Sequence, residues 1–210
     1  PGDEIADETL AWLDANGDQP FFYWAHFFDA HDPYKPPVGF QDFADPYDGE
    51  LAYLDSMLGR LFAALEDDGR WDETLVVVVG DHGEDLMDHG WLGHIKHFHE
   101  ELVRVPLIVR FPDGRRAGAT EKRVVQFVDF GPTVLSLCGV KPDGRLDGVP
   151  FLGKFGRKGP GYAYSHADRF DSVYDRQRSV SDGRYRYVRN YVTDQPYLIA
   201  NAYRERIPMT

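Results

Sequence analysis

The sequence predicts an α/β fold, in which a mostly parallel sheet is flanked by helices and followed by a small antiparallel subdomain. Three features support it. The first is a helical spacing of apolar residues over 50–65, and the second is an unbroken apolar run at 74–79. The third is a set of short strand patterns after residue 150. Strand and helix patterns that follow each other in this way are typical of α/β proteins.

The N-terminal elements follow from their apolar patterns. Residues 4–15 carry apolar side chains with acids between them, which predicts a helix. The aromatic run 20–28 predicts a buried strand, and the proline-rich stretch 29–47 predicts a loop. The segment 50–65 predicts an amphipathic helix with one buried stripe.

Two further strands are expected in the core. The run Thr74 to Val79 has no polar alternation, which is typical of a central strand of a parallel sheet that is covered on both faces. Another strand is expected over 105–111. Pro132 then predicts the first turn of a helix, where its missing N–H costs nothing.

The character of the sequence changes near residue 150. Short strands are expected at 162–165, 178–181 and 184–191, and Asp182 with Gly183 is a strong signal for a tight hairpin. We therefore expect the α/β core over 1–150 and the beginning of a small antiparallel subdomain over 151–210.

The charge of the chain limits its partners. The formal net charge is −12, with 35 acidic and 23 basic residues. Nucleic acids and anionic membranes need basic surfaces, so neither is expected as a partner. Asp accounts for 25 of the acids and Arg for 17 of the bases, which we interpret as adaptation to high salt, where screening weakens repulsion between acidic groups.

The single cysteine and the hydropathy of the chain exclude other classes. Cys138 cannot form an internal disulfide, and its apolar surroundings predict a buried position. No apolar stretch approaches the roughly 20 residues that cross a bilayer. A soluble chain is expected, either in the cytoplasm of a high-salt organism or exported by a signal outside this segment.

The strongest local feature is the valine strand that runs directly into Gly80-Asp81-His82-Gly83-Glu84. Ligands in open α/β sheets bind beyond the carboxyl ends of strands, so Asp81 and His82 stand where chemistry is usual. A carboxylate beside an imidazole offers two metal ligands. Spacing alone leaves metal binding and a capped turn with a surface histidine equally open.

Two other polar segments are candidates. His31 follows the aromatic run and could donate a hydrogen bond to an oxyanion or shuttle a proton, although a turn-stabilising role fits this residue better when it is taken alone. The stretch 93–101 contains His94 and Lys96, whose cationic donors could neutralise a bound anion. A solvated loop or an adventitious metal binder is the alternative for this histidine-rich stretch.

Taken in order, these segments resemble the sulfatase family of the alkaline phosphatase superfamily. The resemblance is carried by His31-Asp32-Pro33-Tyr34, Tyr47-Asp48-Gly49-Glu50, Gly80-Asp81-His82-Gly83-Glu84, Gly93-His94 and Glu100 to Ile108. It continues through Val128 to Leu135, Leu146-Asp147-Gly148, and the hairpin around Asp182-Gly183. The match covers nearly the whole chain in one order. It implies part of an alkaline-phosphatase-like sheet and cleavage of aryl or glycan sulfate esters.

The resemblance also implies roles for individual residues. Asp81 and His82 are similar to a pair of divalent-metal ligands, usually for calcium, with zinc or manganese as alternatives. His31 resembles the histidine that contacts the sulfate ester and protonates the leaving alcohol. His94 stands in the place of a cationic sulfate contact, often lysine in relatives, with Lys96 as the alternative.

The departures from the family pattern shape the remaining expectations. The Cys/Ser-x-Pro-x-Arg motif of the formylglycine nucleophile and the preceding Asp-Asp metal pair are not in this sequence. We therefore expect a segment that is inactive alone and needs the N-terminal half of the same enzyme as its partner. A phosphoester or phosphonate hydrolase of the same superfamily and a non-catalytic binder of sulfated glycans are the rival functions.

Overall fold

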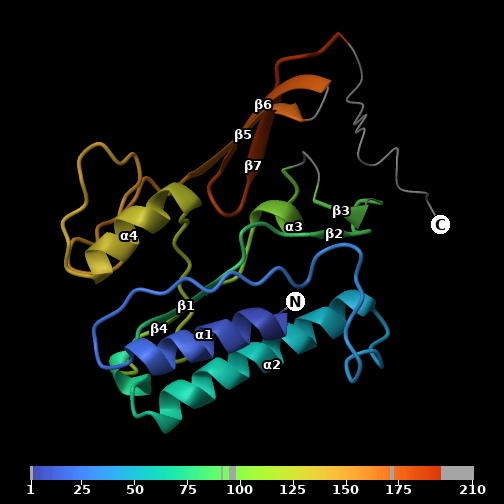
Figure 1. Ribbon diagram of the computed structural model, residues 1–210. Helices are drawn as coiled ribbons and strands as arrows, with labels where there is room; N and C mark the ends of the chain where they lie inside the picture. Colours follow the sequence, from blue (N-terminus) through green and yellow to red (C-terminus); the bar gives the residue numbers. More distant parts are fainter. Residues whose placement is uncertain (1, 91, 95–97, 171–172, 195–210) are drawn as a thin grey trace. The chain divides into compact units, whose positions relative to one another are not determined.

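The computed structural model describes residues 2–90, 92–94, 98–170 and 173–194 (Figure 1). These residues contain helices and strands in the mixed order expected of an α/β chain. In order they are α1 Gly2–Asn16, α2 Pro46–Asp67, the 3-10 helix η1 Trp71–Glu73, β1 Val76–Val79, β2 Asp85–Leu86, β3 Leu92–Gly93, α3 Glu100–Val103, β4 Leu107–Arg110, the 3-10 helix η2 Phe127–Asp129, α4 Phe130–Leu137, β5 Ala163–Phe170, β6 Val173–Ser181 and β7 Arg186–Asn190.

The chain forms two compact units. Unit 1 comprises Pro1–Gly80 and Pro106–Gly118, and unit 2 comprises Asp81–Val105 and Ala119–Thr210. Both units are therefore assembled from segments that are far apart in the sequence. The expected boundary near residue 150 stays a prediction.

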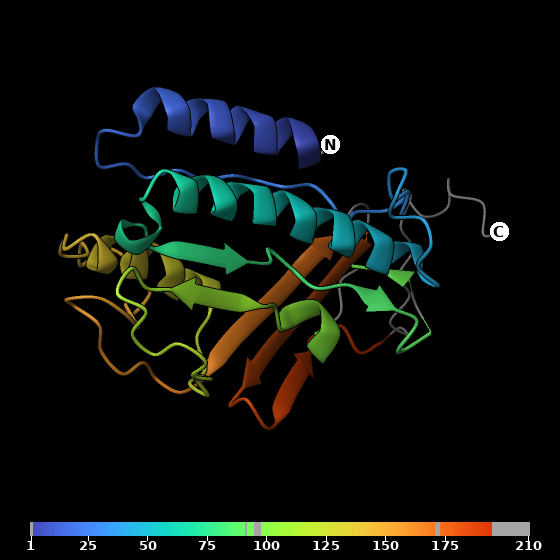
Figure 2. The same cartoon turned by 90° about the horizontal axis from the view of Figure 1, so that it is seen from below.

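In unit 1, helices α1 and α2 lie side by side, as both views show (Figures 1 and 2). Leu13 of α1 and Leu61 and Leu65 of α2 are buried, in agreement with the predicted apolar stripes. Helix α2 begins four residues before the predicted start at Glu50. The reason is local, because the Asp45 carboxylate accepts a hydrogen bond from the backbone N–H of Tyr47 at 2.9 Å and caps the helix end.

The aromatic run after α1 is extended but is not buried as predicted. One face of it touches α1, where the Trp12 ring lies 5.6 Å from Phe21 between centroids. The alternate side chains Phe22, Trp24 and Phe28 are 69%, 77% and 66% exposed. The segment has no ladder partner among the residues described here. Because nearly every residue of the run is apolar, its sequence contained no alternation that could reveal an open face.

The two predicted core strands pair with each other, and the pairing is antiparallel. β1 lies against β4 with Val77 opposite Val109 and Val79 opposite Leu107. This differs from the parallel neighbour that the valine run suggested. An apolar run reports burial and not strand direction. The connection between β1 and β4 holds only the short elements β2, β3 and α3, whereas a parallel crossover usually needs a full helix.

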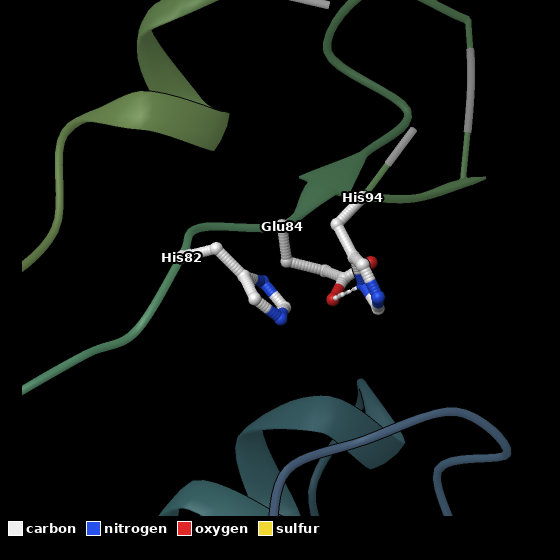
Figure 3. Close-up of side chains that lie close together, drawn as sticks. All are labelled: His82, Glu84 and His94. Carbon is white, nitrogen blue, oxygen red and sulfur yellow. Dashed lines mark hydrogen bonds and ion pairs between the residues drawn. The ribbon is translucent and has the colours of Figure 1, made fainter. Parts of the chain in front are cut away.

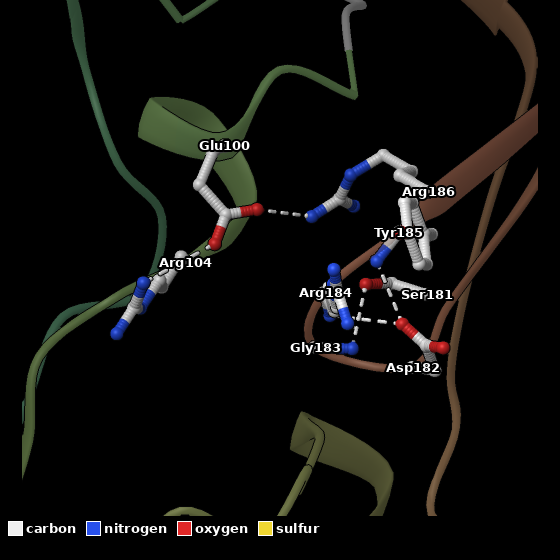
Figure 4. Close-up of polar contacts among 8 residues, drawn as sticks. All are labelled: Glu100, Arg104, Ser181, Asp182, Gly183, Arg184, Tyr185 and Arg186. Atoms are coloured by element: carbon white, nitrogen blue, oxygen red, sulfur yellow. Dashed lines mark hydrogen bonds and ion pairs between the residues drawn. The ribbon is translucent and has the colours of Figure 1, made fainter.

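The C-terminal strands form the expected antiparallel sheet, in the order β5-β6-β7 (Figure 2). The turn between β6 and β7 is the predicted Asp182-Gly183 hairpin. The Asp182 carboxylate accepts hydrogen bonds from the backbone N–H groups of Arg184 and Tyr185 at 2.8 and 2.7 Å, and this holds its pKa below the usual range. Arg186 at the beginning of β7 bonds Glu100 of α3 at 2.6 Å (Figure 4). This ion pair attaches the hairpin to the segment that begins at Asp81.

A buried carboxylate holds the segment after α4 in place. Asp129 is 6% exposed, and its two carboxylate oxygens accept hydrogen bonds from the backbone N–H groups of Val149 at 2.7 Å and Gln126 at 3.2 Å. The backbone carbonyl of Asp129 accepts a hydrogen bond from the Thr133 hydroxyl at 2.6 Å. The Thr133 hydroxyl oxygen in turn accepts a hydrogen bond from the backbone N–H of Phe151 at 3.1 Å. The Val128-Asp129 and Leu146-Asp147-Gly148 signatures are therefore neighbours joined by one side chain.

The prediction that Cys138 is buried is wrong. The thiol residue caps the C-terminal end of α4 and is exposed. Pro132, Thr133 and Ser136 form the buried side of the helix. Position 138 is two residues beyond Ser136, about 200° around a helix with 3.6 residues per turn, so it faces away. Within the described residues, no helix is both long and apolar enough to cross a membrane.

We expect Asp129→Ala to lower the free energy of unfolding by about 2–4 kcal/mol, because two part-buried backbone N–H groups lose their acceptor. Asp143→Ala is the control, since Asp143 is exposed and bonds only its own turn. It should change the free energy by about 0.5 kcal/mol or less. Chemical denaturation followed by circular dichroism measures both. Equal losses in the two variants would contradict the bridging role of Asp129.

A second buried carboxylate holds the proline-rich loop of unit 1. Glu50 of α2 is 6% exposed, and its Oε1 accepts a hydrogen bond from the backbone N–H of Lys35 at 2.5 Å. Burial raises the pKa of Glu50 above its ordinary value of 4.5, with a smaller contribution from the charge of Asp29. Folding therefore favours the protonated carboxyl. This contribution to stability is complete below the unfolded-state pKa and is lost as pH rises through the folded-state pKa.

Glu50→Gln keeps an oxygen that can accept from Lys35 and removes the charge. We expect the stability of the variant relative to the wild type to rise as the pH increases above the ordinary glutamate pKa of 4.5, because only the wild type must ionise a buried group. Glu66→Gln, an exposed glutamate of the same helix, is the matched control and should follow the wild type. Melting temperatures at increasing pH measure the effect. Parallel curves for all three proteins would contradict it.

Candidate active site

The predicted metal segment is held in place by a close backbone contact within unit 2. The N–H of Gly83 donates to the carbonyl of Leu102 in α3 at 2.9 Å. A Cβ atom at position 83 would lie 1.7 Å from the carbonyl oxygen of Glu101, so only glycine fits there. The turn after β1 is thereby fixed against α3, and the side chains on either side of Gly83 take defined directions.

Asp81 and His82 are adjacent in space as well as in sequence. The Asp81 carboxylate accepts a hydrogen bond from the backbone N–H of His82 at 2.9 Å, and its other oxygen lies 3.7 Å from His82 Nε2. His82 Nδ1 lies 2.9 Å from the carbonyl of Gly83, which can only accept, so Nδ1 carries a proton. Nε2 is then the nitrogen that faces the carboxylate. Both side chains are exposed, so a ligand can reach them.

Two further side chains join His82 (Figure 3). The rings of His82 and His94 lie 4.1 Å apart between centroids, and His94 Nδ1 lies 3.1 Å from Glu84 Oε2. One ligand atom from each of His82, Glu84 and His94 lies within 4.8 Å of the others. The structure thus brings together His82 and His94, which the sequence predicted as a metal ligand and an anion contact.

Glu84 is the member of this group that sequence reasoning did not assign. Its side chain is 8% exposed, and its buried Oε1 has no hydrogen-bond partner among the described residues. A buried carboxylate oxygen without a donor is costly unless a cation neutralises it. The group therefore fits a divalent cation. The signal was the motif itself, since Glu84 stands two residues after His82 and three after Asp81.

The structure does not test whether the other two predicted catalytic residues belong to this site. His31 belongs to unit 1, where its ring stacks on Phe28 with centroids 4.4 Å apart and its Nδ1 donates to the carbonyl of Asp32 at 2.7 Å. These contacts set the orientation of the ring. Because Asp81 belongs to unit 2, a site that contains both residues stays a prediction. Lys96, the alternative cationic contact, lies outside the described residues.

Comparison with known families extends these observations. The sulfatase family matches residues 2–140, and the C-terminal family of N-sulphoglucosamine sulphohydrolase matches residues 87–202. The first match contains His31, Asp81, His82, Glu84 and His94. Together the two matches cover both the metal segment and the C-terminal sheet. They confirm the resemblance that the motifs indicated.

Individual relatives agree with the family assignment. An ulvan-active sulfatase of Formosa agariphila is 38% identical over 158 residues, which are 75% of this chain and 26% of that protein. A structure solved with its substrate D-glucosamine-2-N,6-O-disulfate shares 29% identity and a TM-score of 0.61, over 70% of this chain and 31% of that one.

The fold is shared more widely. The yidJ structure from Bacteroides fragilis has a TM-score of 0.80 and 20% identity, over 90% of this chain and 49% of that one. This likeness shows that the α/β core and the antiparallel sheet occur together in a solved structure. The chain spans about a quarter of the length of the ulvan-active relative. On the evidence of its motifs, its fold and two family matches, this chain belongs to the sulfatase family.

Proposed function

We propose that this chain supplies metal-binding and charge-neutralising residues of a sulfatase active site that hydrolyses sulfate esters. The observation that carries the proposal is the group of His82, Glu84 and His94 beside Asp81, directly after β1. In α/β proteins this end of a strand is where ligands bind. A sulfate ester needs a cation to polarise its oxygens and donors that absorb charge as the S–O bond breaks.

The sulfatase family uses a divalent metal, and the donors present here fit one. We propose Asp81 and His82 as ligands, with Glu84 supplying a further carboxylate close by. Calcium is the proposed ion because carboxylate oxygens are its preferred ligands. The imidazole of His82 gives weight to zinc as an alternative, because calcium prefers oxygen ligands, and manganese is the other alternative. When bound, the metal would polarise the sulfate oxygens.

The protonatable residues would act on the two ends of the ester. His31 would donate a proton to the leaving alcohol oxygen, since its ring is held by Phe28 and the carbonyl of Asp32. His94 would contact a sulfate oxygen as a cation, in the place that lysine often takes in relatives, and Glu84 orients its ring through the 3.1 Å contact. Lys96 is the alternative contact.

The substrate is proposed from the relatives. One acts on ulvan and another is solved with a sulfated glucosamine, so a glycan sulfate ester is the first choice and an aryl sulfate the second. The nucleophile and the other two metal ligands would come from an N-terminal half of the same enzyme, the proposed partner of this chain. A phosphoester or phosphonate hydrolase is the rival, because the imidazole of His82 suits zinc better than calcium.

The test measures turnover of p-nitrophenyl sulfate and p-nitrophenyl phosphate by the full gene product that carries this chain. We expect faster sulfate cleavage, loss of activity on chelation, and recovery with calcium. Asp81→Asn should lower kcat/KM by about 10²–10⁴-fold, because metal stabilisation of the reacting group amounts to several kcal/mol. Asp143→Asn is the control and should leave kcat/KM unchanged, because Asp143 is exposed and its carboxylate bonds Arg145 within its own turn.

Three outcomes would contradict the proposal. Faster cleavage of the phosphate ester would favour the rival hydrolase. Full activity in Asp81→Asn would remove Asp81 from the metal site. Metal-dependent binding of a sulfated glycan without any turnover would favour the non-catalytic binder.

A further inference from the structure

A second group of metal-binding side chains lies in unit 2 and shares no residue with the proposed active site. His89 lies between β2 and β3, and His99 and Glu101 lie at the beginning of α3. One ligand atom from each of the three lies within 4.8 Å of the others. His89 Nδ1 is 2.5 Å from Glu101 Oε1, and the rings of His89 and His99 stack with centroids 3.9 Å apart.

The three side chains are carried by anchored backbone. Glu101 is adjacent to Leu102, which receives the hydrogen bond from Gly83. The backbone N–H of His89 faces a carboxylate oxygen of Asp85 at 3.5 Å, and Asp85 is fully buried. The Glu101 side chain is 19% exposed and that of His89 is 47% exposed. An ion from solvent can therefore reach ligands whose backbone positions are already set.

We propose that His89, His99 and Glu101 bind one transition-metal ion, with Zn²⁺ as the first choice. Two imidazoles and one carboxylate are a common set of three zinc ligands, and the fourth position is then left to water. Calcium is disfavoured because it prefers oxygen ligands. The ion would be additional to the metal of the active site, and the inference does not rest on the proposed sulfatase function.

The distances allow this with a small movement. Two ligands bound to zinc at about 2.1 Å in tetrahedral geometry lie about 3.4 Å apart. The distance between His89 Nδ1 and Glu101 Oε1 must therefore increase by about 0.9 Å. Any pair of ligand atoms that lies farther apart than the tetrahedral separation, up to 4.8 Å, must move closer together. Rotation of the side chains is sufficient for changes of this size, because all three residues are reached from solvent or lie at a helix end.

The simpler interpretation is an ion pair in which a proton lies between His89 and Glu101. It explains the 2.5 Å contact and leaves the His99 ring stacked on His89. The two interpretations differ in what His99 does. Metal binding requires a ring nitrogen at position 99, whereas the ion pair requires only a flat side chain that can stack on His89. They also differ in proton release, because a metal ion would displace the proton that lies between His89 and Glu101.

A bound ion would connect two segments that are ten residues apart. His89 precedes β3, while His99 and Glu101 begin α3, so the ion would join the turn before β3 to the helix that supports Gly83. A ligand that binds only the folded state stabilises it by RT ln(1 + L/Kd), where L is the free ligand concentration. Zinc should therefore raise the melting temperature of the protein.

The experiment uses the full gene product in excess Ca²⁺, which would occupy the proposed active-site metal position if that site binds calcium. Zn²⁺ is titrated by calorimetry, and Co²⁺ absorption is used as a probe of tetrahedral coordination. His99→Phe keeps the stacked ring and removes its nitrogens. We expect Zn²⁺ affinity at one site to fall by about tenfold or more. Removing a residue that only hydrogen-bonds a metal ligand already lowers metal affinity by about ten- to a hundredfold. His26→Phe is the control, since it removes an exposed imidazole from unit 1.

Unchanged Zn²⁺ affinity and stoichiometry in His99→Phe would overturn the proposal. Glu101→Gln gives a second test, because it keeps an oxygen for His89 and removes the charge, and it should also weaken binding. If neither variant folds, nitrogen-15 spectra of the wild type decide. Zn²⁺ must shift the ring nitrogens of both His89 and His99, and spectra in which either ring is unaffected would equally overturn the proposal.

Discussion

The contact between Gly83 and the Glu101-Leu102 backbone is the constraint on which both candidate metal groups depend. The 2.9 Å hydrogen bond holds the segment after β1 against α3. This close approach is possible because glycine has no Cβ atom. On one side of Gly83 stands His82, and on the other stands Glu84. Glu101, at the contact itself, carries the carboxylate of the second group. A single glycine thus positions ligands that are nearly twenty residues apart in the sequence.

Buried carboxylates with backbone partners are a recurring device in this chain. Asp129 joins η2 and α4 to the segment at Val149, and Glu50 joins α2 to the loop at Lys35. Each uses a charged oxygen to satisfy N–H groups that have no secondary-structure partner. Glu84 differs from both, because one of its buried oxygens has no donor among the described residues. That oxygen, together with the two nearby imidazoles, makes Glu84 a candidate metal ligand.

The excess of acidic residues across the chain makes local cationic groups important for binding an anionic substrate. With a net charge of −12, the protein as a whole repels anions, so an anionic substrate must be attracted by groups close to it. The cationic groups proposed for this site are a bound metal and His94, with Lys96 as the alternative contact. Substrate affinity at this site should therefore depend on the metal and on local donors and little on long-range attraction, which screening by salt would weaken further.

The sequence by itself determined the family, the helices and the C-terminal hairpin, because these depend on residue order, local spacing and turn chemistry. Asp81, His82 and His94 could be named from motifs for the same reason. Only the tertiary structure decided that β1 and β4 pair antiparallel, that Cys138 faces outward, and that Glu84 joins the two histidines. Strand direction, the buried side of a helix and the convergence of side chains depend on which backbones meet, and a one-dimensional pattern does not contain that information.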